Sequence, residues 1–234
     1  MAQEIPEFVE KCQVKPIASE KKKAEKEEKK SESGTSEQPK SSGNKTAAKS
    51  SQADSAAKDS EETAMVPEQF LTKDVTLTLK TTAGDIPMKL TASKTPCAAS
   101  TIASLAKQGF YDKIVCHRIT TEEIYVLQCG DPDGTGEGGP GFVFKDEYPV
   151  GTDQSNLYKP GVVAMANAGQ NTNGSQFFVT YADSPLPAYY TIFGSVSEAG
   201  MKTVQAIAKK GTKGGVPDGQ PSTEVRIDKA VVSE

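Results

Sequence analysis

The side chains that most often carry acid–base, nucleophilic or metal chemistry are scarce in this chain of 234 residues, which contains one His and four Cys. The cysteines show no C-x-x-C spacing, so we expect no zinc site; they are Cys12, Cys97, Cys116 and Cys129. His117 lies in the sequence VCHRI, where the alternation of a strand would turn it inward. We therefore interpret His117 as a satisfied core residue rather than a catalytic base, and we expect no metal and no other cofactor.

A glycine-rich segment, GTGEGG at residues 134–139, satisfies the G-x-G-x-x-G pattern of dinucleotide-binding loops. That function requires the loop to open a helix, whereas Pro-Gly and a short strand-like GFVF follow here. A calcium loop that begins at Asp131 fits at its first, third and sixth positions, but Phe142 stands at the twelfth, where Glu is needed. We interpret the segment as a glycine-rich surface loop.

The elements that must position a functional site are mostly predicted strands. Residues 75–90 alternate apolar and polar side chains on either side of Ala-Gly-Asp, which predicts a hairpin with one buried face. Thr95 as N-cap, Pro96 in the first turn and Gly109 as a stop predict a helix, and a second helix is predicted over Glu198–Lys209. Further strands are expected at 113–120, 124–128, 162–166, 177–181, 191–196 and 224–232. Many short strands with two helices indicate an all-β domain, built as a closed or nearly closed antiparallel barrel.

A long polar segment precedes these elements. Residues 18–64 contain no Val, Ile, Leu, Met, Phe, Trp or Tyr, and residues 20–62 balance ten Lys against ten Asp or Glu. Such a segment cannot bury enough surface to offset the entropy of ordering it. We therefore predict a disordered low-complexity tail or linker over residues 1–64 and one folded domain over 65–234. The tail could be a spacer or could have no specific role, and its composition does not separate these alternatives.

Composition also excludes some classes of partner. No stretch approaches the ~18 apolar residues of a membrane-spanning helix, and the start of the chain lacks the pattern of a signal peptide. The formal net charge of −4 provides no basic field for nucleic acid. We expect neither a membrane segment in this chain nor a nucleic-acid partner.

Two stretches of the domain resemble the cyclophilin family of peptidyl-prolyl cis-trans isomerases. In the first, VCHRITTEEIYVLQCGDPDGTGEGGPGF, the segment YVLQCGD is similar to the family's F-M-x-Q-G-G-D. In the second, GVVAMANAGQNTNGSQFFVTYADSPLPAYYTIFGSV, the segments MANAG and NTNGSQFF are close to its longest signature. The likeness runs from about Val75 to Val232 and is greatest to the extracytoplasmic cyclophilins of actinobacteria. It implies a closed antiparallel eight-stranded β-barrel and favours an extracytoplasmic over a cytoplasmic location.

The activity that this resemblance implies is rotation about X–Pro bonds in proline-containing polypeptides, which assists protein folding. A catalyst must offer a fixed hydrogen-bond donor to the twisted amide, beside an apolar cup for the ring. The resemblance places the catalytic guanidinium at Arg118, and it implies that Gln128 orients this group and contacts the substrate. The residues expected to line the proline pocket are Tyr125, Val126, Phe178 and Leu186. Contacts to the flanking peptide are expected from Ala166, Asn167 (through its backbone) and Gln176, with Tyr190 where the family often has His or Tyr.

Some positions depart from the family pattern and leave alternatives open. Pro185 stands about where many members have Trp, which weakens the expectation that a cyclosporin-type ligand binds. Cys129 replaces a Gly, and we expect at least one disulfide among Cys97, Cys116 and Cys129 in an oxidising compartment; buried free thiols are the alternative. An active isomerase is the expected function, and a non-catalytic module that binds proline peptides, or a chaperone, is the competing one.

Overall fold

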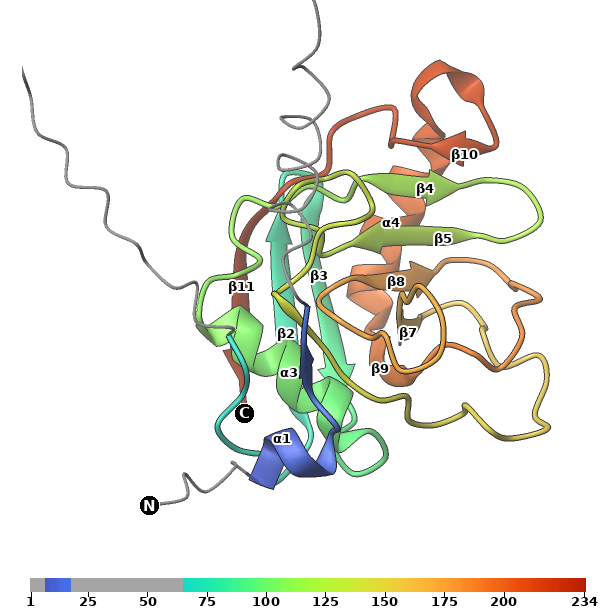
Figure 1. The fold of residues 1–234 in the computed structure, drawn as a ribbon. Helices are drawn as coiled ribbons and strands as arrows, with labels where there is room; N and C mark the ends of the chain where they lie inside the picture. The colour runs from blue at the N-terminus through green and yellow to red at the C-terminus, as the bar shows by residue number, and fades with distance from the viewer. Residues whose placement is uncertain (1–6, 18–64) are drawn as a thin grey trace, which may run out of the picture. The chain divides into compact units, whose positions relative to one another are not determined.

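An antiparallel sheet of nine strands dominates the part of the chain that the computed structural model describes, residues 7–17 and 65–234 (Figure 1). Along the sheet the strands follow the order β10-β4-β5-β8-β7-β9-β3-β2-β11. Their bounds are β2 (Val75–Thr81), β3 (Gly84–Leu90), β4 (Arg118–Thr120), β5 (Val126–Cys129), β7 (Val162–Met165), β8 (Phe177–Thr180), β9 (Ile192–Val196), β10 (Asp218–Gly219) and β11 (Ile227–Ser233). A separate two-stranded sheet joins β1 (Lys15–Pro16) to β6 (Phe142–Val143).

The predicted hairpin is confirmed as β2 and β3. Leu77 lies opposite Met88 and Leu79 opposite Ile86, and all four side chains are buried. The alternate residue Lys80 is exposed. Since successive side chains of a strand point to opposite faces, the period-two pattern gives the sheet one apolar face, which faces the core.

Within the described residues three α-helices accompany the sheet, where the sequence predicted two: α1 (Glu7–Lys11), α3 (Pro96–Lys107) and α4 (Glu198–Lys210). The prediction that Thr95 caps α3 is partly wrong, because Thr95 precedes the helix but its side chain makes no capping hydrogen bond. Glu147 instead accepts hydrogen bonds from the backbone N–H groups of Cys97 (3.0 Å) and Ala98 (2.9 Å). A carboxylate at this end satisfies free donors and suits the positive end of the helix dipole. None of the helices in the two described ranges is long and apolar enough to cross a membrane.

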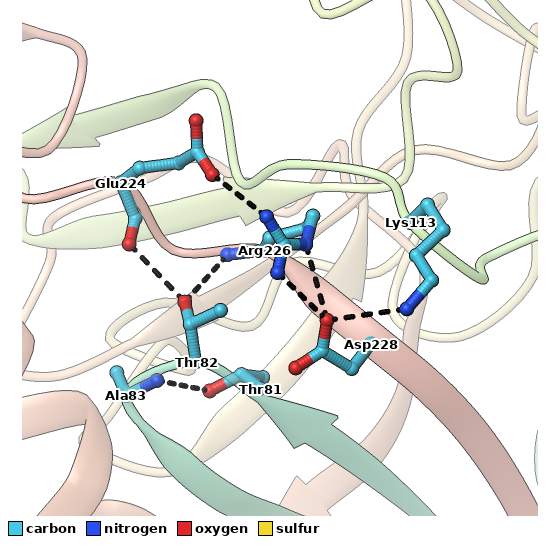
Figure 2. Close-up of polar contacts among 7 residues, drawn as sticks. All are labelled: Thr81, Thr82, Ala83, Lys113, Glu224, Arg226 and Asp228. Carbon is cyan, nitrogen blue, oxygen red and sulfur yellow. Dashed lines mark hydrogen bonds and ion pairs between the residues drawn. The ribbon is translucent and has the colours of Figure 1, made fainter.

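The curled sheet has its two edges at β10 and β11 rather than the closed order of eight strands that was expected. Backbone hydrogen bonds nevertheless join the segment just before β4 to the start of β11 and the residues that precede it: Cys116 N–H donates to the carbonyl of Val225 (2.8 Å), and Ile227 N–H donates to that of Ile114 (2.8 Å). On the outside of this seam Arg226 pairs with the carboxylates of Glu224 and Asp228 (Figure 2). The strands expected at 113–120 and 224–232 are therefore shorter than predicted, because their first residues form this seam.

The predicted boundary of the tail is wrong at its N-terminal end. Residues 7–17 pack on the domain: Phe8 and Cys12 are fully buried, and β1 pairs with β6. Few apolar residues suffice there, because the segment adds to a core that the domain already provides and is linked to it covalently. The rest of the predicted tail, residues 18–64, lies outside the described residues.

Two disulfides link the four cysteines. Cys116 pairs with Cys129, so the bridge expected among the domain cysteines is present. Cys97 pairs with Cys12, across a sequence separation of 85 residues. That second pairing was not predicted, because Cys12 had been assigned to a disordered tail.

Candidate active site

Three neighbouring strands bring predicted site residues into one row. Arg118 on β4 lies opposite Gln128 on β5, and Gln128 lies opposite Phe178 on β8. Residues directly opposite each other in a sheet project to the same face. The guanidinium, the amide and the phenyl ring therefore share the face of the sheet that does not contribute to the main core.

That face has an apolar cluster of its own, separate from the main core, in which Tyr158, Ala164, Phe178 and Val126 are buried. The pocket at this cluster has a volume of about 150 Å³ and is lined by Arg118, Ile124, Val126, Gln128, Ala166, Asn167, Phe178, Leu186 and Tyr190. Of these residues only Ile124 was not predicted. We call this cavity the proline pocket, after the role predicted from the sequence for the residues of its apolar wall.

Arg118 is held by two partners. Its Nε and Nη2 donate to the two carboxylate oxygens of Asp218 (2.8 and 2.7 Å), and its Nη1 donates to Oε1 of Gln128 (3.0 Å). A guanidinium has five N–H donors, so one hydrogen on each Nη atom has no partner among the described residues and is left for a ligand. The carboxylate raises the pKa of Arg118, and the guanidinium lowers the pKa of Asp218, so both are charged at neutral pH.

Sequence reasoning missed Asp218. It lies on β10, and the hydrogen bonds to Arg118 span 100 residues of sequence. Asp218 reaches Arg118 through the sheet register, which pairs Asp218 on β10 with Thr120 on β4 at the edge of the sheet. The only local signal was a turn-forming Pro-Asp-Gly, which indicates a turn but no ion pair.

A chain of amides extends from Arg118 across the site. The Nε2 group of Gln128 donates to Oε1 of Gln176 (2.8 Å). The Nε2 group of Gln176 in turn donates to the carbonyls of Gly136 and Gly138, each at 2.9 Å. Each amide is thus oriented by its neighbour, and the chain connects the guanidinium to the glycine-rich loop.

The glycine-rich loop is organised around a buried carboxylate. Asp131 accepts hydrogen bonds from the backbone N–H groups of Asp133 (2.8 Å), Gly136 and Gly138. Burial alone would raise the pKa of Asp131, but these three donors outweigh it and lower the pKa. A Cβ atom at Gly138 would lie 2.0 Å from a carboxylate oxygen, which explains the need for glycine there. The loop is therefore a fixed wall of the site rather than a cradle for phosphate.

A second pocket adjoins the proline pocket. It has a volume of about 400 Å³, and Gln128, Ala166 and Asn167 line both cavities. Gln176, predicted to contact the flanking peptide, lines this second pocket and not the proline pocket. Asn167 donates through Nδ2 to the carbonyl of Tyr189 (3.0 Å). Its backbone N–H and carbonyl have no partner within the described part of the chain, so both could bind a peptide main chain.

Tyr158 is a supporting residue that the sequence did not reveal. Its hydroxyl donates to the carbonyl of Tyr190 (2.9 Å) and accepts from the N–H of Tyr190 (3.1 Å). The rings of Phe178 and Tyr190 meet edge to face, with centroids 5.5 Å apart. Burial raises the pKa of Tyr158 to about 12, so the hydroxyl remains a neutral donor. These contacts fix Tyr190 at the edge of the proline pocket.

Two predicted assignments differ from the structure. Tyr125 lines neither pocket, because the alternation that turns Val126 into the proline pocket turns Tyr125 away, against the ring of Tyr181 (5.8 Å). His117 is buried as expected but is not satisfied: neither ring nitrogen has a hydrogen-bond partner among the described residues. Burial lowers the pKa of His117, so the ring is neutral at neutral pH. No group of three or more His, Cys, Asp or Glu in residues 7–17 and 65–234 is arranged to hold a metal ion.

Comparisons with known proteins agree with this geometry. A family model described as "Cyclophilin type peptidyl-prolyl cis-trans isomerase/CLD" matches residues 76–232. The chain is 46% identical over 162 residues to the probable peptidyl-prolyl cis-trans isomerase B of Mycobacterium tuberculosis, a match that covers 65% of this chain and 53% of that protein. It is 39% identical over 162 residues to peptidyl-prolyl cis-trans isomerase cypE of Dictyostelium discoideum, which covers 68% of this chain and 97% of the relative. The chain spans about half the length of the mycobacterial B-type relatives that it matches.

Solved structures show the same fold. A cyclophilin-type peptidyl-prolyl cis-trans isomerase of Cryptosporidium parvum has a TM-score of 0.59 and 31% sequence identity, over 69% of this chain and 98% of that one. A structure of the same kind, determined in the presence of the dipeptide Ala-Pro, has a TM-score of 0.58 and 31% identity, over 68% and 99% of the two chains.

Proposed function

Because the chain belongs to the family of cyclophilin-type peptidyl-prolyl cis-trans isomerases, we propose that it catalyses rotation about X–Pro bonds in proline-containing polypeptides. The observation that carries the proposal is the guanidinium of Arg118, fixed by Asp218 and Gln128 with two N–H groups to spare. It lies at the rim of a pocket whose wall is formed by Val126 and Phe178.

The chemistry follows from the resonance of the amide. Rotation about the C–N bond has a barrier of ~18–20 kcal/mol, because the planar form has partial double-bond character. In the twisted state the proline nitrogen becomes pyramidal and its lone pair can accept a hydrogen bond. A free N–H of Arg118 donates to that nitrogen, while the apolar wall holds the ring and excludes water from it. Because the lone pair is delocalised in the planar amide and available only in the twisted state, this interaction is stronger in the transition state than in the ground state.

Neighbouring groups would hold the peptide on either side of the proline. Asn167 offers its backbone N–H and carbonyl, which no described residue occupies, and Ala166 lies beside it in both pockets. Gln128 stands between the two pockets and also bonds Arg118. By binding the peptide on both sides of the proline, these contacts orient the X–Pro bond that rotates.

The test replaces Arg118 and, as a matched control, Arg226. Both side chains are about equally exposed, 38% and 39%, and both pair with carboxylates, but Arg226 lies at the seam of the sheet (Figure 2). We expect Arg118→Ala to lower the isomerisation rate of a proline tetrapeptide by about 100-fold, in line with loss of one transition-state donor. Arg226→Ala should retain wild-type activity, and circular dichroism should show both variants folded.

Unchanged activity in a folded Arg118→Ala protein would refute this catalytic role. A wild-type protein that binds proline peptides in an NMR titration but isomerises none would instead be the non-catalytic binding module or chaperone. The partners are proline-containing polypeptides rather than nucleic acid, in accord with the net charge of −4. Weak binding of a cyclosporin-type ligand is proposed because Pro185 replaces the family's Trp.

An extracytoplasmic location is supported by the two disulfides, since such bonds persist in oxidising compartments. We further propose that the sheet functions as a closed barrel, in which the hydrogen bonds of Cys116 and Ile227 complete the wall. In hydrogen exchange these two amides should then be protected like those of the central strands, and exchange at the rate of loop amides would contradict closure.

A further inference from the structure

The N-terminal segment reaches the substrate-binding face. Ile17 lines the second pocket, and its side chain remains 53% exposed. We propose that Ile17 is a specificity-determining residue, which makes the second pocket prefer an apolar side chain two residues away from the substrate proline. This inference rests on the proposed isomerase function.

The backbone, and not its own side chain, fixes the position of Ile17. We call residues 12–17 the N-terminal strap. The strap begins at the Cys12–Cys97 disulfide, and the carbonyl of Cys12 accepts a hydrogen bond from Lys145 N–H (3.0 Å). Its strand β1 pairs with β6, and Ile17 N–H donates to the carbonyl of Gly141 (2.9 Å). The strap is thus held along its length, while the exposed Ile17 side chain is free to contact a ligand.

The two pockets are continuous, since Gln128, Ala166 and Asn167 line both of them. In an extended peptide, side chains two residues apart point to the same face at a spacing of about 6.5–7 Å. A peptide that places its proline in the proline pocket therefore directs the side chain two residues away toward the second pocket.

The lining of the second pocket indicates which side chain it accepts. Ile17 is joined by the apolar groups of Pro140, Phe142 and Val143. Glu137 is the one ionisable residue among the described residues that line this pocket. Its carboxylate disfavours an acidic side chain, so the preferred substrates carry Leu or a similar apolar residue at this position.

The experiment compares the kcat/KM values of paired tetrapeptides that differ only in Leu or Gly. In one series the variable residue lies two positions before the proline, and in the other it lies two positions after it. Burial of an aliphatic side chain is favourable, and roughly half of Ile17 remains to be covered, so its contribution to the Leu/Gly ratio is about 4- to 13-fold. We expect Ile17→Ala to reduce that ratio by this factor in one of the two series.

Val216→Ala is the matched control, because Val216 is an exposed aliphatic residue (46%) that lines neither pocket. Its Leu/Gly ratios should equal those of the wild type. A second variant, Cys12→Ser with Cys97→Ser, removes the covalent anchor of the strap. It should lower the Leu/Gly ratio in the same peptide series in which Ile17→Ala lowers it. Unchanged ratios in Ile17→Ala would overturn the proposal, as would an equal reduction in Val216→Ala.

Binding provides a readout that does not depend on catalysis. When the Leu peptide is added, the δ1-methyl resonance of Ile17 should shift together with the resonances of Val126 and Leu186. If the residues of the proline pocket shift and Ile17 does not, this inference fails while the proposed function stands. If the wild type isomerises no peptide, the proposed function fails, and the shift of Ile17 still decides whether the strap contacts peptide.

Discussion

Replacement of Asp218 by Ala should lower catalytic efficiency, although Asp218 lines neither pocket. This carboxylate accepts two of the three hydrogen bonds that fix the guanidinium of Arg118. An arginine side chain carries about 2 kcal/mol of rotamer entropy, and the bond to Gln128 would retain part of the restraint. If about half of this rotamer restraint is lost, the transition state loses ~1 kcal/mol of stabilisation. That loss corresponds to about a fivefold fall in kcat/KM.

The same change should have little effect on stability. The side chains of Arg118 and Asp218 are 38% and 53% exposed, so solvent screens the pair. Exposed ion pairs contribute less than about 1 kcal/mol. The guanidinium lowers the pKa of Asp218, so the stabilisation is present above the ordinary carboxyl pKa and is lost only as pH falls through the lowered value. At neutral pH the pair is fully ionised, and rates can be compared there directly.

The decisive assay is a double-mutant cycle on kcat/KM with a proline tetrapeptide. Asp218→Ala should lower kcat/KM in the wild-type background and have no effect in the Arg118→Ala background, because it acts through that side chain. Asp228→Asn is the control, since Asp228 also pairs with an arginine, Arg226, but away from the site (Figure 2), and it should leave kcat/KM unchanged. Equal losses from Asp218→Ala in both backgrounds, or no loss in either, would refute the reasoning.

The remaining predictions concern stability and the two disulfides. Burial lowers the pKa of His117 in the folded protein, so between that lowered value and the ordinary value of about 6.5 the unfolded chain binds the proton more readily. The free energy of unfolding should therefore fall as pH drops below neutral. Denaturant titrations at a series of pH values should show that His117→Gln flattens this dependence of stability on pH. If stability depends on pH as steeply in the variant as in the wild type, other groups are responsible for that dependence. The double variant Cys116→Ser with Cys129→Ser removes the disulfide that joins residues 13 apart in sequence. It should lower the free energy of unfolding by about 3 kcal/mol. Non-reducing mass spectrometry of alkylated, unfolded protein from an oxidising compartment should find no labelled cysteine, and full labelling would contradict both bridges.

Several features could be predicted from the sequence because their signals are local. The hairpin of β2 and β3 follows from alternation within a few residues, and α3 begins at Pro96 as the helix-start pattern indicates. The site motifs are also short, and eight of the ten predicted site residues line the proline pocket. Tyr125 was misplaced because a motif assigns a residue to a site without stating which face of the strand it occupies.

The sequence by itself determined the family, the sheet-forming segments and most residues of the pocket, since each depends on the order of neighbouring residues. Only the tertiary structure decided that Asp218 holds Arg118 across 100 residues and that Cys12 joins Cys97 across 85. It also placed Ile17 beside the second pocket, in a segment whose composition indicated disorder. The physical reason is that periodicity reports which face of one element is apolar. The partner of that face is set by sheet register and by packing against a core assembled from distant segments, and no local pattern encodes either.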